Sequence, residues 1–272
     1  MALTKQQIGV VRRCDRVVVQ SDSDRVCQRL GDPGRRLPRP ASRAHVIRYN
    51  DSVMRTVLST VCCAVLLAVP AVGADDGWVE LWDGSTFSGW KLSTDNPSTF
   101  KIVDGAIVAQ GPRAHLFYAG EVNGGVFRDF ELKVDVLAKN NSNGGIYFHT
   151  DFQETGWPRK GFEVQVNNTF QRDPRKSGGL YGVSDNLIAP VGDDEWFEEH
   201  IVVRGNTVKI YVNGHLITNW VQPEDWDGLR PLPNGRGQSF PERKLSSGTI
   251  ALQGHDPNSV VMYKNIRIKV LD

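Results

Sequence analysis

The stretch GFEVQVNN, residues 161–168, places three polar side chains at every second position. Because side chains alternate between the two faces of a β-strand, Glu163, Gln165 and Asn167 are expected on one face, with apolar residues on the other. A carboxylate beside two amides can serve as an acid or base on a sugar, hold sugar hydroxyls, or form the solvated face of a sheet. Neighbouring strands with the same pattern distinguish these alternatives.

Three further segments show the same division between an apolar and a polar face: GGIYFHT (144–150), SGGLYG (177–182) and TIALQGH (249–255, if the strand continues through its glycine). Their polar faces carry Tyr147, His149, Tyr181, Gln253 and His255. Sugar hydroxyls need both donors and acceptors, and the C–H faces of a sugar pack on aromatic rings. Four segments with this bias favour a sugar-binding surface over an ordinary solvated sheet face.

The elements that carry these residues are predicted to be β-strands throughout. FKIVDGAIVAQ (100–110) and VKIYVNGHLIT (208–218) are alternating runs joined by Asp-Gly and Asn-Gly, the dipeptides preferred in two-residue hairpin turns. Further strands are expected at 130–138, 198–205 and 260–271, and no window predicts an amphipathic helix of ordinary length. Short strands with regular turns indicate an all-β sandwich or barrel.

Two long polar segments, 151–160 and 222–248, interrupt the strand pattern. Loops of this length in a compact domain are usually functional or mobile. They contain Trp157 and Arg243, which are candidate sugar contacts with packing as the alternative role for each.

The chain divides into three parts. Residues 54–74 combine a positive start, an apolar core and a small-residue end at Ala74, which is typical of a secretory signal peptide. We therefore expect 1–53 to be an Arg-rich extension from an incorrect upstream start, and 75–272 to be one exported, periplasmic or extracellular domain without stable membrane insertion. That domain holds 20 Lys and Arg against 26 Asp and Glu, a formal charge of −6, which argues against nucleic-acid binding. All four cysteines precede Ala74, so the expected mature domain forms no internal disulfide.

The ordered segments LWDGSTFSGW, NNSNGGIYFHT, GFEVQVNN, SGGLYG, EWFEEHIVVRGNTVKIYVNG and GTIALQGHDPNSVVMYKNIRIKVL resemble the 3-keto-disaccharide hydrolase family from about Glu80 to Leu271. The resemblance implies a concanavalin A-like jelly-roll β-sandwich of two antiparallel sheets with a concave sugar-binding face. It also implies an exported hydrolase that acts on an oligosaccharide or glycoside and cleaves 3-keto-glycosides.

The single glutamate of the 161–168 strand restricts the chemistry. Retaining glycosidases use two carboxyl groups about 5–5.5 Å apart, and the amides of Gln165 and Asn167 cannot replace the second one. A ketone at C3 of the sugar acidifies the C2 proton, so that one base suffices for elimination. Glu163 and His255 are the candidate bases, and His149 is a further candidate catalytic group.

Three alternatives stay open from the sequence. The domain can be a non-catalytic carbohydrate-binding module on the same fold. It can be a conventional glycosidase whose second acid comes from a loop, the candidates being Asp151, Glu154 and Asp256. His149, Glu163 and His255 are also candidate ligands of a divalent metal, although the spacing contains no H-x-H or HExxH motif.

Overall fold

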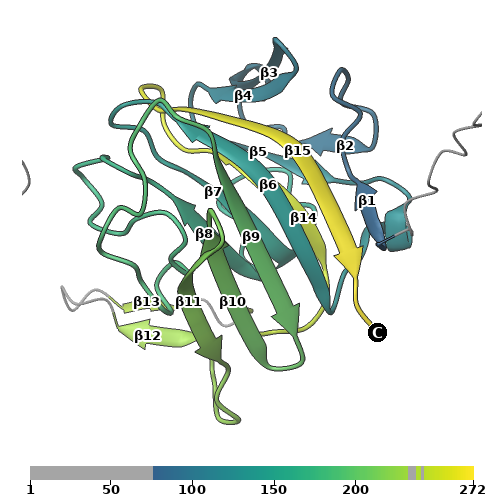
Figure 1. Cartoon of the computed structure of the whole chain (residues 1–272), viewed down its shortest axis with the longest axis vertical. Coiled ribbons are helices and arrows are strands. Elements are labelled where there is room, and N and C mark those ends of the chain that lie inside the picture. Colours follow the sequence, from purple (N-terminus) through teal and green to yellow (C-terminus); the bar gives the residue numbers. More distant parts are fainter. Residues whose placement is uncertain (1–75, 232–236, 240–241) are drawn as a thin grey trace, which may run out of the picture. The chain divides into compact units, whose positions relative to one another are not determined.

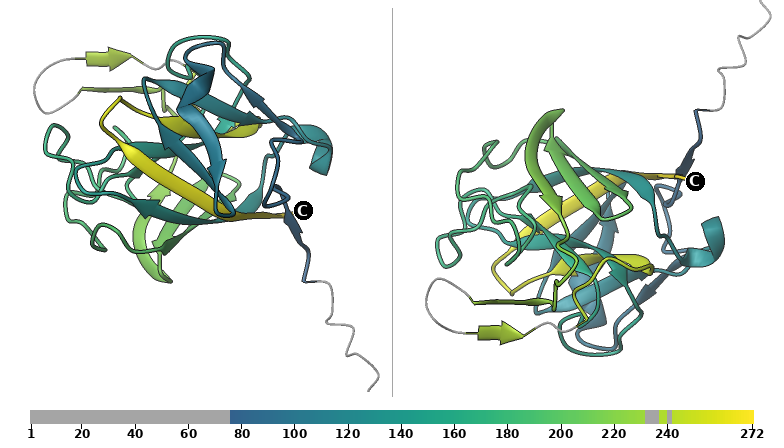
Figure 2. Two further views of the ribbon diagram at one scale, coloured as in Figure 1. Left: turned by 90° about the horizontal axis from the view of Figure 1, so that it is seen from above. Right: turned by 90° about the horizontal axis from the view of Figure 1, so that it is seen from below.

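The computed structural model describes residues 76–231, 237–239 and 242–272. The predicted extension 1–53 and signal peptide 54–74 lie outside the described residues. Two antiparallel sheets form two packed layers (Figures 1 and 2). Helical structure in the described residues is limited to two short 3-10 turns, η1 (Pro97–Thr99) and η2 (Val122–Gly125). The all-β prediction and the jelly-roll sandwich implied by the resemblance are confirmed.

The larger sheet has the strand order β11-β10-β9-β6-β15-β4-β3, and β1 pairs with the far end of β15. Its strands are β1 (Trp78–Glu80), β3 (Phe100–Val103), β4 (Ala106–Gln110), β6 (Phe130–Ala138), β9 (Phe197–Arg204), β10 (Thr207–Val212), β11 (His215–Val221) and β15 (Val260–Val270).

The smaller sheet has the order β2-β5-β14-β7-β8. Its strands are β2 (Trp90–Leu92), β5 (Ala114–Tyr118), β7 (Gly144–Thr150), β8 (Phe162–Val166) and β14 (Thr249–Gly254). A separate hairpin of β12 (Leu229–Pro231) and β13 (Gly237–Ser239) lies apart from both sheets (Figure 1).

The two predicted hairpins have the backbone that their turn residues favour. Asp104 and Gly105 have φ angles of 49° and 69°, and Asn213 and Gly214 have φ angles of 48° and 76°. Successive positive φ angles define the turn whose twist matches that of the flanking strands. The turns therefore set the register of β3 with β4, and that of β10 with β11 from the turn to Tyr211, beyond which the register of this pair shifts.

The hydrophobic core lies between the sheets and follows from the alternation of the strands. In β9 and in β6 up to Val136, buried and more exposed residues alternate, so one face is apolar and the other contacts water. In the smaller sheet, β7, β8 and β14 are buried at every position. The face of this sheet that points away from the core is thus covered as well, and this is the face with the polar side chains. None of the helices in the described part of the chain has the length and apolar character needed to span a bilayer.

Candidate functional site

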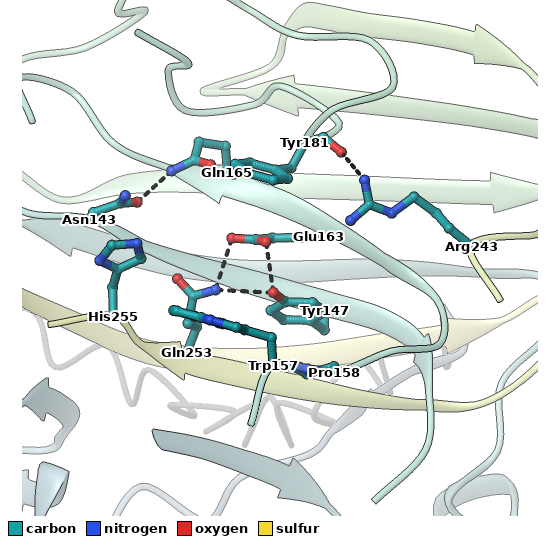
Figure 3. A pocket seen from close by; sticks show the side chains of 10 residues that line it. All are labelled: Asn143, Tyr147, Trp157, Pro158, Glu163, Gln165, Tyr181, Arg243, Gln253 and His255. Atoms are coloured by element: carbon teal, nitrogen blue, oxygen red, sulfur yellow. Dashed lines mark hydrogen bonds between the residues drawn. The ribbon is translucent and has the colours of Figure 1, made fainter. Parts of the chain in front are cut away.

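A pocket of about 110 Å³ opens on the polar face of the smaller sheet (Figure 3). Its floor comes from β7, β8 and β14, which are neighbours in the sheet. Its walls come from the loops before and after β8, the segments before β7 and β14, and the connection after β14. The residues that line it are Asn143, Tyr147, Trp157, Pro158, Glu163, Gln165, Tyr181, Arg243, Gln253 and His255.

Glu163 lies at the centre of the pocket and accepts hydrogen bonds on both carboxylate oxygens (Figure 3). The hydroxyl of Tyr147 donates to Oε2 over 2.7 Å, and Nε2 of Gln253 donates to Oε1 over 2.9 Å. Nε2 of Gln253 also lies 3.2 Å from the Tyr147 hydroxyl. Three adjacent strands thereby hold one carboxylate in a fixed orientation.

Gly145 on β7 makes room for this carboxylate. It pairs with Gln165 of β8, and Glu163 lies two positions before Gln165 on the same strand. A Cβ atom at this position would lie 2.6 Å from Oε1 of Glu163 and 2.9 Å from its Cγ. The glycine is therefore required for Glu163 to lie flat over β7, and it is a site residue that the sequence reasoning missed.

Burial shifts the pKa values of Glu163 and Tyr147. It raises the pKa of the Glu163 carboxyl, while the donors Tyr147 and Gln253 and the charge of Arg243 act in the opposite direction. Burial and the Glu163 charge raise the pKa of Tyr147 well above its ordinary value. Tyr147 is therefore a protonated donor at neutral pH.

Arg243 brings positive charge to the same pocket. Its side chain is buried, and Nη1 donates to the backbone oxygen of Tyr181 over 2.7 Å. Burial lowers the pKa of Arg243, and the nearby Glu163 acts against this. A guanidinium remains charged in proteins, so Arg243 is a fixed cation beside the carboxylate.

Two amides offer buried acceptors to a ligand. Nε2 of Gln165 donates to Oδ1 of Asn143, and Nε2 of Gln253 is engaged by Glu163 and Tyr147. Their Oε1 atoms are buried, and neither has a hydrogen-bond partner among the described residues. An unpaired buried acceptor costs about 1–3 kcal/mol, so a ligand hydroxyl that donates to it is favoured.

His255 forms one wall of the pocket. Its Nδ1 atom lies 2.9 Å from Oδ2 of Asp256. Its ring packs against Trp157 and edge-on against Phe170, with centroid distances of 5.4 and 5.6 Å. The ring therefore contacts two aromatic side chains and, at one nitrogen, a carboxylate.

The 151–160 loop presents Trp157 to the pocket because Asp95 anchors it. Oδ2 of Asp95 accepts from the backbone nitrogen of Gly156 over 2.7 Å and from Nη2 of Arg113 over 2.8 Å. The hydrogen bond from Gly156, followed by that from Arg113, lowers the pKa of Asp95. The Trp157 side chain keeps 40% of its surface exposed, so one part of the indole is free to meet a ligand.

The sequence predicted ten site residues, and the structure brings eight of them into this one pocket: Tyr147, Trp157, Glu163, Gln165, Tyr181, Arg243, Gln253 and His255. Their proposed roles stay predictions. Asn167 lies elsewhere: its Nδ2 atom donates to the backbone oxygens of Asp173 and Arg175, and its Oδ1 accepts from the nitrogen of Phe170. Asn167 therefore organises the loop after β8 rather than the pocket.

His149 also lies away from the pocket, which corrects the expected alternation of β7. It has a φ angle of 54°, and the register of β7 with β14 shifts at this point. Its ring nitrogens bond the backbone oxygen of Arg128 and the backbone nitrogen of Ser246. Burial lowers the pKa of His149 to about 4, so the ring is neutral at pH 7.

The candidate metal set of His149, Glu163 and His255 is consequently not assembled. Within residues 76–231, 237–239 and 242–272, no three His, Cys, Asp or Glu side chains are grouped so that they could hold a metal ion.

The sequence reasoning missed Asn143, Pro158 and the residue behind the pocket, His115. Asn143 precedes Tyr147 by four positions, so continued alternation would have placed it on the same face. His115 lies fully buried on β5 opposite Gln253. Its ring meets those of Tyr147 and Trp157 edge-on at 5.5 and 5.6 Å. Burial lowers its pKa to about 3, which makes it a neutral support beneath both side chains.

Comparison with known proteins agrees with this architecture. A 3-keto-disaccharide hydrolase of Bacteroides thetaiotaomicron is 24% identical over 235 residues, which cover 72% of this chain and 79% of that protein. A Parabacteroides distasonis protein provisionally described as a glycosyl hydrolase superposes with a TM-score of 0.59 at 23% identity, covering 72% of this chain and 94% of that one. A second structure of that description and organism gives a TM-score of 0.57 at 21% identity, covering 71% and 99%.

The family model that matches the chain spans residues 77–269, nearly all of the sandwich. Its extent agrees with the resemblance noted from the ordered sequence segments. The chain belongs to the family of 3-keto-alpha-glucoside-1,2-lyase-like domains.

Proposed function

We propose that this protein cleaves the glycosidic bond of 3-keto-glycosides by elimination, followed by addition of water. Membership of the family and the name of the Bacteroides relative support a carbohydrate-active enzyme of this kind. The observation that carries the proposal is that Glu163 is the only carboxylic acid lining the pocket in the described part of the chain.

A conventional glycosidase needs a second carboxylic acid, and the described residues place none in this pocket beside Glu163. Of the three loop candidates, Asp151 pairs with Lys160, Glu154 is exposed, and Asp256 is bonded to His255. Residues 232–236 and 240–241, which the structure does not describe, contain neither Asp nor Glu. The retaining mechanism needs two carboxyl groups on either side of one bond, so it is disfavoured.

A ketone at C3 of the sugar reduces the number of catalytic groups that the protein must supply. A base removes the C2 proton, the electrons form an enolate, and the C1–O bond then breaks with its electron pair on the departing oxygen. That oxygen takes a proton, and water later adds across the C1–C2 double bond. One base, one electrophile for the ketone oxygen and one acid for the leaving group therefore suffice.

The pocket contains a candidate for each role. Nδ1 of His255 is occupied by Asp256, which leaves Nε2 as the base for the C2 proton. The buried cation Arg243 suits the enolate oxygen, because charge stabilisation is strong where water is excluded. Glu163 is the candidate acid for the leaving oxygen in its protonated form, which burial favours and which the donors Tyr147 and Gln253 and the cation Arg243 disfavour.

The proposal is tested with a glucoside and its 3-keto derivative, each incubated with the purified protein in D2O. We expect cleavage of the 3-keto compound alone, with one deuterium incorporated at C2 of the released sugar, measured by mass spectrometry. Cleavage of both compounds at similar rates would support an ordinary glycosidase instead. Binding of either compound without any cleavage would support a carbohydrate-binding module.

We also propose that the protein is exported, because residues 54–74 have the charge, apolar core and small-residue end of a signal peptide. Mass analysis of the protein recovered from the periplasm or medium tests this. A mature N-terminus near Asp75 is expected, and an uncleaved intracellular chain would contradict it.

A further inference from the structure

Asp256 lies directly after the pocket residue His255, in the connection between β14 and β15. Its two carboxylate oxygens have different partners. Oδ1 accepts from the backbone nitrogen of Asn258 over 3.0 Å, which closes a local turn. Oδ2 accepts from Oγ of Ser259 over 2.7 Å and lies 2.9 Å from Nδ1 of His255. One oxygen shapes the loop, and the other faces the imidazole.

The serine that holds Asp256 is itself tied to the pocket. Ser259 is buried, and its Oγ accepts from the backbone nitrogen of Asn143 over 2.9 Å. Oδ1 of Asn143 in turn accepts from Gln165. A continuous set of hydrogen bonds therefore runs from Gln165 on β8, through Asn143 and Ser259, to Asp256 and His255.

The carboxyl of Asp256 is an anion in this setting. Burial raises its pKa, but the hydrogen bonds from Ser259, His255 and Asn258 outweigh burial and hold the pKa below its ordinary value. An anion accepts hydrogen bonds and cannot donate them, so a neutral His255 must place its proton on Nδ1. Its Nε2 atom then carries a lone pair.

We propose that Asp256 is a positioning residue that fixes His255 in the tautomer with an unprotonated Nε2, so that this nitrogen can remove the C2 proton of a 3-keto-glycoside. The catalytic half of this inference rests on the proposed function. The assignment of the tautomer rests only on the hydrogen bonds. Trp157 and Phe170 contact the same ring and limit its rotation, so the lone pair keeps its direction.

The variant Asp256→Asn separates this role from that of a turn former. Its amide oxygen can still accept from Asn258, while its NH2 group faces Nδ1 of His255. An NH2 group donates, so His255 must present an unprotonated Nδ1 and carry its proton on Nε2. The turn is retained and the base is lost.

The first measurement is the tautomer of His255, read from the ring nitrogen shifts by NMR of the purified protein. The chain has six histidines, and His255→Gln identifies the signal that belongs to His255. We expect a protonated Nδ1 in the unsubstituted protein and a protonated Nε2 in Asp256→Asn. The same tautomer in both proteins would overturn the inference, whether or not a substrate is known.

The second measurement is turnover of a 3-keto-glucoside and deuterium exchange at its C2 position. Loss of a correctly placed base costs about 10²- to 10⁴-fold in rate, so kcat of Asp256→Asn should fall by at least 100-fold with little change in KM. Asp256→Glu, which keeps the carboxylate, should recover part of the rate. Turnover of Asp256→Asn within twofold of the unsubstituted protein would overturn the positioning role.

The experiments distinguish failure of the proposed function from failure of the positioning role of Asp256. An unsubstituted protein that turns over no 3-keto-glycoside contradicts the proposed function, while the NMR result still decides whether Asp256 sets the tautomer. An active protein with an unaffected Asp256→Asn variant contradicts the further inference alone. Thermal unfolding of each variant checks that a loss of rate is not a loss of fold.

Discussion

Glu163 and Glu199 are both buried glutamates, but they lie in different regions of the sandwich. Glu163 is on the outer face of the smaller sheet, where Tyr147 and Gln253 donate to it and a pocket opens above it. Glu199 is on β9 among the core positions, where Oε1 accepts only a 3.2 Å hydrogen bond from the nitrogen of Gly178. Its Oε2 has no hydrogen-bond partner within the described residues.

The difference teaches that burial alone does not mark a site of chemistry. Burial raises the pKa of both carboxyls, to about 8 for Glu199. Only Glu163 also has two side-chain donors, a nearby cation and access to a ligand. A perturbed group in a cleft with specific partners is the better candidate for function, whereas Glu199 is expected to affect stability.

The largest predicted effect is that of Glu163→Gln on turnover. The amide keeps the size of the side chain but can neither give nor take a proton as the carboxyl does. We expect kcat for a 3-keto-glucoside to fall by about 10²- to 10⁴-fold, the usual contribution of a general acid or base. Initial rates measured by mass spectrometry check this.

The matched control is Glu199→Gln, which should leave turnover within about threefold because the amide oxygen can still accept from Gly178. His215→Ala replaces an exposed strand residue and serves as a control for losses of rate that arise from preparing a variant protein. Equal losses of rate in the two glutamine variants would remove the distinction between the two regions.

The second prediction concerns stability and pH. Glu199 has a raised pKa, so its stabilising contribution is complete below about pH 4.5 and is lost as the pH rises towards about 8. In that interval the folded state binds more protons than the unfolded state, and the free energy of unfolding falls by up to about 1.4 kcal/mol per pH unit. Glu199→Gln should flatten this dependence.

Urea unfolding of both proteins at several pH values between 4.5 and 8 measures the two slopes. The absolute stability of the variant is expected to differ as well, because the new NH2 group lacks an acceptor. The comparison therefore concerns the slopes alone. Parallel curves for the two proteins would show that Glu199 does not titrate in this range.

Much of the fold was predictable because alternation and turn chemistry act locally. The strands at 130–138, 144–150 and 249–254 and the two hairpin turns agree with the structure. Alternation also placed Tyr147, Glu163 and Gln253 on one face. The strand expected at 198–205 carried the same signal for Glu199, which falls between inward Phe197 and Ile201, but no face was assigned to that strand.

The rest depended on contacts between distant segments. Whether the polar face meets water depends on the loops that cover it, and Asp95 anchors one of them through Gly156, 61 positions away. The direction of His149 depends on Gly161 and Gly248, whose missing side chains leave room for its distorted backbone. A Cβ atom on either glycine would collide with the backbone at positions 148–150. A periodic pattern contains no information on such close approaches.

The smallest predicted effect concerns Trp157 in the 151–160 loop. This loop borders the pocket above Glu163, and Glu199 lies in the core without such an opening. Trp157 is 40% exposed and adds an aromatic surface at the mouth of the pocket. An aromatic contact contributes about 0.5–1.5 kcal/mol, so Trp157→Ala should raise KM by about 2- to 12-fold with kcat nearly unchanged. Steady-state kinetics on a 3-keto-glucoside measure both constants.

The control is Trp196→Ala, since Trp196 is exposed to a similar extent, 37%, and its ring contacts Lys264 rather than the pocket. If both tryptophan variants change KM equally, Trp157 does not contact the substrate. If Trp157→Ala lowers kcat instead, the indole acts by holding the ring of His255, which it contacts at 5.4 Å. The separate changes in KM and kcat therefore decide whether Trp157 binds the sugar or orients His255.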